Sequence, residues 1–358
     1  FKKHFFLEFQ LACSSFYIIT VANKFKKANR MSSKPLRVVV TRKLPDVVEQ
    51  RMSELFDVRL RNTLAPMSEK ELSVAISEAD VLVSSLGDKL NHSVLFQDCD
   101  NLKLIANYGA GFDHIDIKTA INNGIVVTNT PDVLSTDTAD MTMALILGVP
   151  RKIYEGSQII RSGEWTGWAP TALLGNRIAG KRLGILGMGR IGQAVAERAS
   201  SFGLILHYHT RTQLHRESEE RLKAKFWNNL DDMLRHIDIL SIHVPHTPAT
   251  FHLINARRLK LLHKNAFIIN TARGEIIDEN ALTRMLRASE LAGAGLDVYT
   301  NSKNINPRLR DLNNVMLLPH MGSATHESRL EMGEKVIINI KTFEDGHRPP
   351  DQVLPNML

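Results

Sequence analysis

Short apolar runs alternate with helical patterns along most of the chain. In the first third, the runs expected to be strands lie at 36–41, 58–61, 81–84, 102–107 and 125–128, and helical patterns lie between them, for example over 45–55 and 68–78. Strands that are apolar throughout and are separated by helices are typical of a parallel sheet covered on both faces. This part of the chain therefore predicts an open α/β sheet.

A second series of the same kind follows. Strands are expected at 183–186, 204–208, 239–244, 266–270, 293–297 and 315–318, with helices over 229–236, 255–262 and 278–288. The pattern predicts a second doubly wound sheet. A last helical pattern at 326–343 is expected to return to the first sheet, which makes the first domain discontinuous.

The second series begins with a glycine-rich turn between a strand and a helix. Gly187 allows a tight turn, Gly189 lets the backbone approach a pyrophosphate, and Gly192 lets the helix pack closely on its strand. The N–H groups at the start of the helix favour phosphate. We predict that this segment binds a dinucleotide through Gly187, Met188, Gly189, Arg190, Ile191 and Gly192.

The end of the next strand bears on the choice of cofactor. Enzymes that use NAD usually carry an acid there, about twenty residues past the glycines, to hold the ribose 2′-hydroxyl. This chain has Thr210, Arg211 and Thr212 instead, with Arg211 nineteen residues after Gly192. A guanidinium pairs with a 2′-phosphate, and the threonines donate to it. We expect NADP(H) as the preferred cofactor; NAD(H) is the alternative if Arg211 is only a solvated loop charge.

These patterns predict an α/β protein with two doubly wound parallel-sheet domains, in which a Rossmann cofactor domain (131–318) is inserted in a flavodoxin-like substrate domain (31–130 and 319–358). A long helical stretch at 136–163 is expected to pack between the domains. The following loop, 161–175, holds Trp165 and Trp168, which either line a substrate pocket or make packing or subunit contacts. Residues 1–30 are expected to be a disordered or non-native extension before Met31; a basic targeting peptide is the alternative.

Composition limits the partners. The net charge is +7, but six basic residues and only Glu8 among the acids lie within 1–30, which leaves +2 for the rest of the chain. No basic stripe with interleaved aromatics is present, so we expect no nucleic-acid partner. Cys13 and Cys99 provide neither a disulfide framework nor zinc spacing, and no run reaches about eighteen apolar residues. We expect no metal, no membrane span and a cytoplasmic location.

Small and polar residues stand at the ends of several expected strands. Loops at 84–88 and 107–113 expose backbone N–H groups that suit a small carboxylate, although each is equally compatible with an ordinary turn. In the second sheet, Arg273 and His320 each follow a strand. Reduction of a 2-oxo acid needs a cation to clamp the carboxylate and a proton donor that titrates near neutral pH. Arg273 and His320 match these two roles.

Several long motifs carry a family resemblance. The runs NTARGEIIDENAL (270–282), GAGLDVY (293–299) and LLPHMGSAT (317–325) resemble the D-isomer-specific 2-hydroxyacid dehydrogenases. GEWTGWAPT (163–171) and HVPHTPAT (243–250) are most similar to the glyoxylate/hydroxypyruvate reductases of that family. The resemblance extends from Leu36 to the C-terminus.

The resemblance implies roles for individual residues. Arg273 binds the substrate carboxylate and carbonyl, and His320 protonates the new alkoxide. Asp297 contacts the nicotinamide carboxamide, and a homodimer forms largely through the cofactor domain. The backbone amides offered to the carboxylate are those of Ala110 and Gly111, with Leu86 and Gly87. The remaining cofactor residues are Val244, Pro245, Thr250, Thr271, Ala272 and Gly322, together with Arg273 and His320.

One position departs from the family pattern. The family usually carries a Glu twenty-nine residues after the Arg, where it hydrogen-bonds the catalytic His and raises its pKa, and this chain has Ser302 there. A hydroxyl can orient His320 but does not supply the charge that stabilises imidazolium. We therefore expect the pKa of His320 to be lower than in relatives. Asp311 is a nearby substitute candidate.

The leading hypothesis is an NADPH-dependent reductase that converts glyoxylate or hydroxypyruvate to the D-2-hydroxy acid. The alternative is a catalytically weakened, dinucleotide-sensing binding protein of the same fold. Arg273 and His320 favour the enzyme, whereas Ser302 favours the binding protein. A formate dehydrogenase relative is less favoured, because those enzymes commonly pair the His with Gln.

Overall fold

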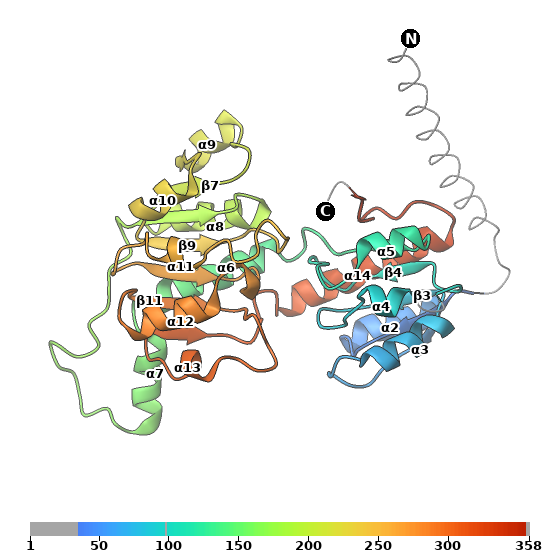
Figure 1. Ribbon diagram of the computed structural model, residues 1–358. Helices are drawn as coiled ribbons and strands as arrows, with labels where there is room; N and C mark the ends of the chain where they lie inside the picture. Colours follow the sequence, from blue (N-terminus) through green and yellow to red (C-terminus); the bar gives the residue numbers. More distant parts are fainter. Residues whose placement is uncertain (1–34, 97–98, 356–358) are drawn as a thin grey trace, which may run out of the picture. The chain divides into compact units, whose positions relative to one another are not determined.

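The computed structural model describes residues 35–96 and 99–355 and divides the chain into two compact units (Figure 1). Among the described residues, unit 1 comprises those up to Val133 and those from Arg329 onward, and unit 2 comprises Leu134–Ser328. The expectations for residues 1–30 lie outside the described residues. Within the described ranges, none of the helices combines the length and the apolar character needed to cross a membrane.

Unit 1 is built on a five-stranded parallel sheet in the order β2-β1-β3-β4-β5. The strands are β1 (Arg37–Val40), β2 (Asp57–Arg59), β3 (Val81–Val83), β4 (Leu104–Ala106) and β5 (Val126–Thr128). Its helices are α2 (Asp46–Leu55), α3 (Glu69–Glu78), α4 (His92–Leu95), α5 (Ile117–Asn122) and most of α14 (His326–Glu344). The expected flavodoxin-like order is confirmed.

Alternate residues of these strands enter two separate cores, because successive side chains of a strand point to opposite faces. Val39 packs with α3, α4 and α5, whereas Val38 and Val40 pack with α2 and α14. The red helix α14 thus belongs with the blue elements of the N-terminal part in Figure 1. Gly333 of α14 sits so close to α2 that a Cβ there would lie 2.4 Å from Val48.

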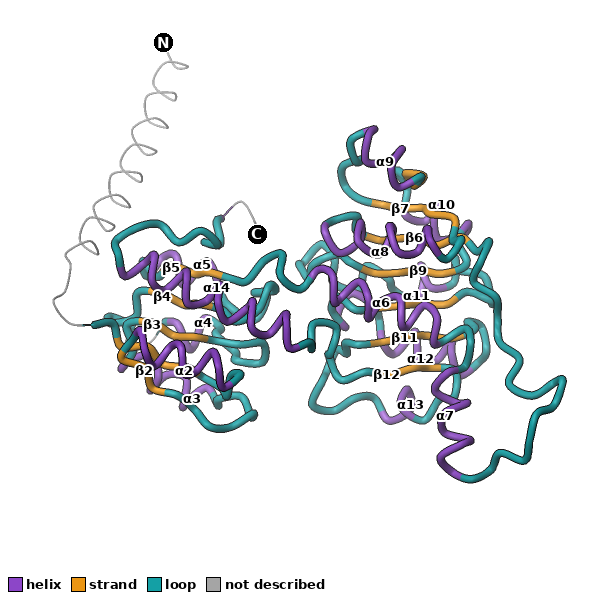
Figure 2. The backbone as a smooth tube through the Cα atoms, turned by 180° about the vertical axis from the view of Figure 1, so that it is seen from behind, coloured by secondary structure: helices purple, strands orange, loops and turns teal. Residues whose placement is uncertain are grey.

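Unit 2 is built on a seven-stranded parallel sheet in the order β12-β11-β10-β9-β6-β7-β8. The strands are β6 (Arg182–Leu186), β7 (Ile205–His209), β8 (Ala224–Phe226), β9 (Ile239–Ile242), β10 (Phe267–Asn270), β11 (Gly293–Leu296) and β12 (Val315–Leu317). The order reverses between β6 and β9, as in a Rossmann sheet. Figure 2 shows its strands in orange with helices before and behind them.

The helices of unit 2 cover both faces of this sheet. On one face, α6 (Ser135–Gly148) and α8 (Arg190–Ser201) pack on the strands. On the other, α10 (Leu230–His236), α11 (Ala256–Leu259) and α12 (Glu279–Arg287) do so. The remaining helices are α7 (Ile153–Ser162), α9 (Arg216–Leu222), α13 (Pro307–Arg310) and the 3-10 turn η1 (Gly274–Ile276). The insertion of a Rossmann unit in a flavodoxin-like unit is confirmed.

The single long helix expected over 136–163 is wrong. The chain forms α6 and α7 instead, separated at residues 149–152. Pro150 cannot donate to a continuing helix and its ring crowds the preceding turn, and Lys152 adopts a left-handed φ of 54°. Helix α6 is buried on several faces, whereas none of the residues of α7 is buried.

Residues 319–328 belong to unit 2, whereas the expected domain boundary assigned them to the substrate domain. Two sets of hydrogen bonds hold this segment. The N–H groups of Met321 and Gly322 both donate to Asp297 at 2.8 Å, and the Thr325 and Ser328 hydroxyls both donate to Asp137. These contacts keep the segment with unit 2 as far as Ser328, and unit 1 resumes at Arg329.

Candidate active site

The glycine turn after β6 is shaped by its own packing. Gly187 has a φ of 96°, and a Cβ there would lie 2.8 Å from the backbone of His243. A Cβ at Gly192 would lie 2.2 Å from the carbonyl oxygen of Gly187. A Cβ at Gly189, in contrast, would meet nothing within 4 Å. Protein packing therefore explains the first and last glycines, and the open side of Gly189 fits a ligand that approaches the backbone.

The first turn of α8 suits an anion. Its N-cap is Gly189, so no side chain caps the first N–H groups, and none of its first-turn residues is acidic. Uncapped N–H groups and the positive end of the helix dipole favour phosphate. The segment from Gly187 to Gly192 thus fits the pyrophosphate of a dinucleotide.

The segment after β7 is fixed by side-chain hydrogen bonds. The Thr210 hydroxyl donates to the carbonyl of Thr212 at 2.6 Å, and Nδ1 of His209 donates to the carbonyl of Trp227 at 2.8 Å. Arg211 and Thr212 are exposed. Glu219 of α9 hydrogen-bonds Tyr208 and Gln213. The Glu219 carboxylate is therefore held by protein groups. The cation of Arg211 follows the end of β7 and is exposed.

The loop after β9 runs past the same edge of the sheet. Val244 packs beside Gly187, since a Cβ at Gly187 would lie 2.9 Å from its Cγ1. The Thr250 hydroxyl donates to the carbonyl of Pro245 at 2.6 Å and accepts the N–H of Thr247 at 2.8 Å. These bonds close the loop on itself beside the turn that fits the pyrophosphate.

Arg273 stands on a turn at the end of β10, and a buried amide holds this turn. Asn270 is 1% exposed; its Nδ2 donates to the carbonyl of Arg273 at 2.8 Å, and its Oδ1 accepts the N–H of Ala272 at 3.0 Å. The Thr271 hydroxyl shares a 2.8 Å hydrogen bond with Thr142 of α6. Both amide atoms of Asn270 are thus used to set the path of the backbone at Arg273.

His320 stands on a turn at the end of β12, and Asp297 holds this turn. The backbone at His320 is left-handed, with a φ of 55°, and its N–H donates to the carbonyl of Asp297 at 2.9 Å. Asp297 is 1% exposed, and its carboxylate accepts the N–H groups of Met321 and Gly322, the two residues after His320. Burial raises the pKa of the Asp297 carboxyl. The imidazole-bearing residue itself is exposed.

The two turns are connected through the strand between them. Strand β11 lies between β10 and β12, and the N–H of Asp297 donates to the carbonyl of Asn270 at 3.0 Å. Unit 2 therefore places Arg273 and His320 after the ends of β10 and β12, the two strands that flank β11, with Asp297 at the end of β11 between them. A guanidinium and an imidazole are groups that can clamp an anion and donate a proton, respectively.

In unit 1, the loop after β4 turns its carbonyls toward two side-chain amides, the buried Asn107 and the partly buried Asn129. Asn107 donates to the carbonyls of Gly109 and Gly111 at 2.9 Å, and Asn129 donates to the carbonyl of Ala110 at 2.7 Å. In a planar trans peptide the N–H points opposite to the C=O. The N–H groups of Ala110 and Gly111 therefore point away from these amides, as binding of a small carboxylate requires.

The loop after β3 is a tight turn. The N–H of Asp88 donates to the carbonyl of Ser85 at 3.1 Å, which places Leu86 and Gly87 at its centre. Gly87 has a φ of 101°, the conformation that the second central residue of a type II turn requires. Leu86 and Gly87 thus present backbone groups at the carboxyl end of β3.

The chain is similar to known proteins over most of its length. Residues 143–322 match the model of the D-isomer specific 2-hydroxyacid dehydrogenase, NAD binding domain. A glyoxylate reductase of Thermococcus litoralis is 41% identical over 326 residues, which are 90% of this chain and 98% of the relative.

The chain belongs to the D-isomer specific 2-hydroxyacid dehydrogenase family.

Solved structures of D-isomer specific 2-hydroxyacid dehydrogenases agree with this fold. A family protein from Polaromonas has a TM-score of 0.84 at 37% identity and covers 90% of this chain and 100% of its own. An NADPH-dependent glyoxylate/hydroxypyruvate reductase from Sinorhizobium meliloti, solved with NADP and malonate, has a TM-score of 0.80 at 34% identity and covers 89% of this chain and 97% of its own. The chain is a nicotinamide-dinucleotide-dependent dehydrogenase.

The position of the family's usual Glu is on a surface loop in this 2-hydroxyacid dehydrogenase. Ser302 is exposed, six residues after the end of β11. Asp311, the candidate substitute, caps the end of α13 and lies 3.9 Å from Arg310, with 74% of its side chain exposed. An exposed acid that faces a neighbouring Arg is poorly placed to stabilise the imidazolium of another residue.

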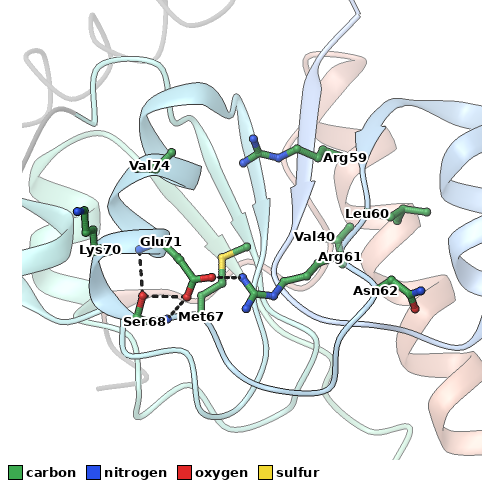
Figure 3. Close-up of a pocket in the computed structure, with 10 residues that line it drawn as sticks. All are labelled: Val40, Arg59, Leu60, Arg61, Asn62, Met67, Ser68, Lys70, Glu71 and Val74. Carbon is green, nitrogen blue, oxygen red and sulfur yellow. Dashed lines mark hydrogen bonds and ion pairs between the residues drawn. The ribbon is translucent and has the colours of Figure 1, made fainter.

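Unit 1 of the dehydrogenase also carries a surface pocket of about 570 Å³, shown in Figure 3. It is lined by the end of β2, the loop that follows, the start of α3 and Val40 of β1, and it contains none of the expected site residues. Glu71 accepts the N–H and the hydroxyl of Ser68 and then Nη1 of Arg61, which together lower the pKa of its carboxyl to about 2. Because this Arg is already paired, we do not assign the pocket to the substrate.

Sequence reasoning did not predict that asparagine side chains shape the loop after β4 and the turn after β10. Asn107, Asn129 and Asn270 use their side chains to fix backbone groups next to the expected site residues. Their position at strand ends was the available signal. Asn side chains commonly bond to nearby backbone at such places.

Proposed function

We propose that the protein reduces a small 2-oxo acid, glyoxylate or hydroxypyruvate, to the D-2-hydroxy acid with NADPH. The observation that carries this is the pair of turns at the ends of β10 and β12, the two strands that flank β11, one bearing Arg273 and the other His320. The N–H of Asp297 donates to the carbonyl of Asn270, and Asp297 also accepts hydrogen bonds from the turn at His320. The similarity to glyoxylate reductases supports the substrate class.

In this proposal each residue has a separate task. Arg273 holds the carboxylate and polarises the carbonyl of the substrate, and the amides of Ala110, Gly111, Leu86 and Gly87 hold the carboxylate. His320 gives a proton to the carbonyl oxygen as it becomes an alkoxide. The reduced nicotinamide supplies the hydride when it is bound.

The cofactor residues are proposed on the same basis. The segment from Gly187 to Gly192 takes the pyrophosphate, and Thr210, Arg211 and Thr212 take the 2′-phosphate. The absence of an acid at positions 210–212 supports NADPH over NADH. Val244, Pro245 and Thr250 flank the adenosine half, while Thr271, Ala272, Asp297 and Gly322 lie toward the nicotinamide.

We also propose that the protein is a homodimer formed through unit 2. Helix α7 buries none of its residues, and large apolar side chains crowd this helix and the loop after it. They include Ile153, Tyr154, Ile160, Trp165, Trp168 and Leu174, of which Trp168 is 84% exposed. Apolar side chains concentrated in this way mark an interaction surface.

Steady-state kinetics test the proposed activity. Rates with glyoxylate, hydroxypyruvate and pyruvate are compared with NADPH and with NADH, using protein that begins at Met31. We expect turnover of the first two acids, with higher kcat/KM for NADPH. The absence of turnover, combined with tight binding of the dinucleotide, would instead favour the dinucleotide-sensing protein, for which the exposed Ser302 is the supporting observation.

A further inference from the structure

Arg42 lies at the point where the strand order of the unit 1 sheet reverses. It follows β1, and the turn with Leu86, Gly87 and Asp88 follows β3, the neighbouring strand. The chain goes from β1 to β2 on one side and β3 lies on the other, so the carboxyl ends of β1 and β3 flank the switch point. In open α/β sheets, ligands bind at this place.

The guanidinium of Arg42 packs against this turn. A Cβ at Gly87 would lie 2.9 Å from Nη2 of Arg42, and the same Nη2 lies 3.9 Å from Oδ1 of Asp88. The Arg42 side chain is 23% exposed and the Asp88 side chain is fully buried. The positive charge therefore lies beside Gly87, at the carboxyl end of β1.

The guanidinium of Arg42 has Asp88 as a counter-charge, but part of it is left without hydrogen bonds. Nε and Nη2 of Arg42 and Oδ1 of Asp88 are buried and lack a hydrogen-bond partner within residues 35–96 and 99–355. The other oxygen of Asp88 accepts the Thr41 hydroxyl at 2.6 Å and the N–H of Ser85 at 2.8 Å. The donors of Thr41 and Ser85 thus hold the Asp88 carboxylate, while its separation from Arg42 exceeds hydrogen-bonding distance.

Buried polar atoms without a hydrogen-bond partner are rare in folded proteins, and a functional role is one reason for them. The loop in front of Arg42 is the one whose backbone amides we propose for the substrate carboxylate. We propose that Arg42 is a positioning residue for that carboxylate: its charge favours an anion on the Leu86–Gly87 turn, and its packing keeps the turn in shape. This inference rests on the proposed function.

The test separates the charge of Arg42 from its packing. Arg42→Met and Arg42→Gln remove the charge, Arg42→Lys keeps it, and Arg59→Met removes a cation at the end of β2 as a matched control. Each variant is assayed with glyoxylate and with a neutral glyoxylate ester. Binding of oxalate is measured by calorimetry in the presence of the dinucleotide, which needs no turnover.

For Arg42→Met we expect the KM for glyoxylate and the Kd for oxalate to rise about tenfold, with kcat changed by less than about threefold, because a nearby charge acts on the bound anion. The KM for the ester should be unchanged, and Arg42→Lys and Arg59→Met should resemble the wild type. Equal changes for acid and ester, or no change for either, overturn the inference.

The remaining outcomes are also decisive. Wild-type protein without turnover that still binds oxalate overturns the proposed activity but leaves the effect of Arg42 readable in the Kd. Wild-type protein that neither turns over 2-oxo acids nor binds oxalate overturns both. Loss of the fold in Arg42→Met and Arg42→Gln alike makes Arg42 a structural residue and overturns the inference.

Discussion

The side-chain amide of Asn270 donates to the carbonyl oxygen of Arg273 at 2.8 Å. Replacing Asn270 with Asp keeps the shape but puts a carboxylate oxygen against that carbonyl. We expect kcat/KM for the 2-oxo acid to fall about 100-fold, because small displacements of a positioned group are costly, while the Kd for the dinucleotide changes little. Steady-state kinetics and equilibrium binding of the dinucleotide check this.

Asn314→Asp is the matched control for this prediction. Asn314 makes the same kind of bond, from Nδ2 to the carbonyl of Leu286 at 3.2 Å, but it precedes β12 and so lies at the opposite edge of the sheet. Its kcat/KM should stay near the wild-type value. Equal losses in the two variants would mean that a general loss of stability, rather than the position of Arg273, causes the effect.

Arg211 should determine the preference for the phosphorylated cofactor. Arg211→Gln is expected to lower kcat/KM for NADPH by about 10- to 100-fold and to leave that for NADH nearly unchanged, because charge-assisted bonds to the 2′-phosphate are lost. The measurement is the ratio of the two kcat/KM values. Arg216→Gln removes an exposed arginine of α9 and should not alter the ratio. An unchanged ratio in Arg211→Gln would assign the preference to other residues.

A carboxylate at position 302 should strengthen the proton donor. A nearby negative charge favours imidazolium, and reduction needs the protonated ring. For Ser302→Glu we expect the alkaline limb of the kcat/KM profile to move to higher pH and the rate at neutral pH to rise. Asn304→Glu adds the same charge two residues further along the exposed loop and serves as the control. Superimposable profiles for wild type and Ser302→Glu would contradict the prediction.

The stability of unit 2 should depend on His207. This residue is 4% exposed, its Nδ1 accepts the indole N–H of Trp227 at 3.1 Å, and the ring of His236 lies 4.9 Å away. Burial, then the charges of His236, Lys225 and Arg182, lower the pKa of His207 to about 4 against a partial opposing effect of Asp238. The unfolded chain therefore binds a proton at a pH where the folded chain does not.

The sign follows from that difference. Stability from neutral His207 is complete above about pH 6.5 and is lost as the pH falls toward 4, by on the order of 3 kcal/mol. Urea unfolding of wild type between pH 4.5 and 7.5 should show this slope, and His207→Gln should reduce it. His347→Gln, which changes an exposed histidine of unit 1, should not. An identical slope in wild type and His207→Gln would exclude His207 as the responsible group.

The proposed homodimer can be tested on α7. Ile160 is 58% exposed, and Ile160→Glu places a charge in the apolar surface of this helix. We expect the molar mass measured by light scattering to fall toward that of one chain, because a buried unpaired charge opposes association. Ile205→Glu changes an isoleucine of similar exposure, 52%, at the start of β7 and is the control. A monomeric wild type would rule out the proposal directly.

Much of the fold follows from local pattern, and the exceptions have physical causes. Runs such as Val38–Val40 were predicted as strands because they are apolar throughout, and they are apolar because both faces of the sheet are buried. The glycine turn was predicted from the spacing of its glycines. The break at Pro150 was missed since apolar residues continue on both sides of it. The amides of Asn107 and Asn129 meet the same loop from two strand ends, a relationship that depends on the sheet and not on spacing along the chain.

The carbonyls of the loop after β4 point toward Asn107 and Asn129. As a result, recognition of a carboxylate and selection by substrate size depend on different parts of this loop. In the site that we propose, the groups that face the ligand are main-chain N–H groups, and the side chains that fix them, Asn107 and Asn129, bond to the opposite side of the loop. Replacing Ala110 with a larger residue would change the space beside a substrate without removing a donor to its carboxylate. Selectivity for substrate size can therefore be redesigned at this loop while acid recognition is retained.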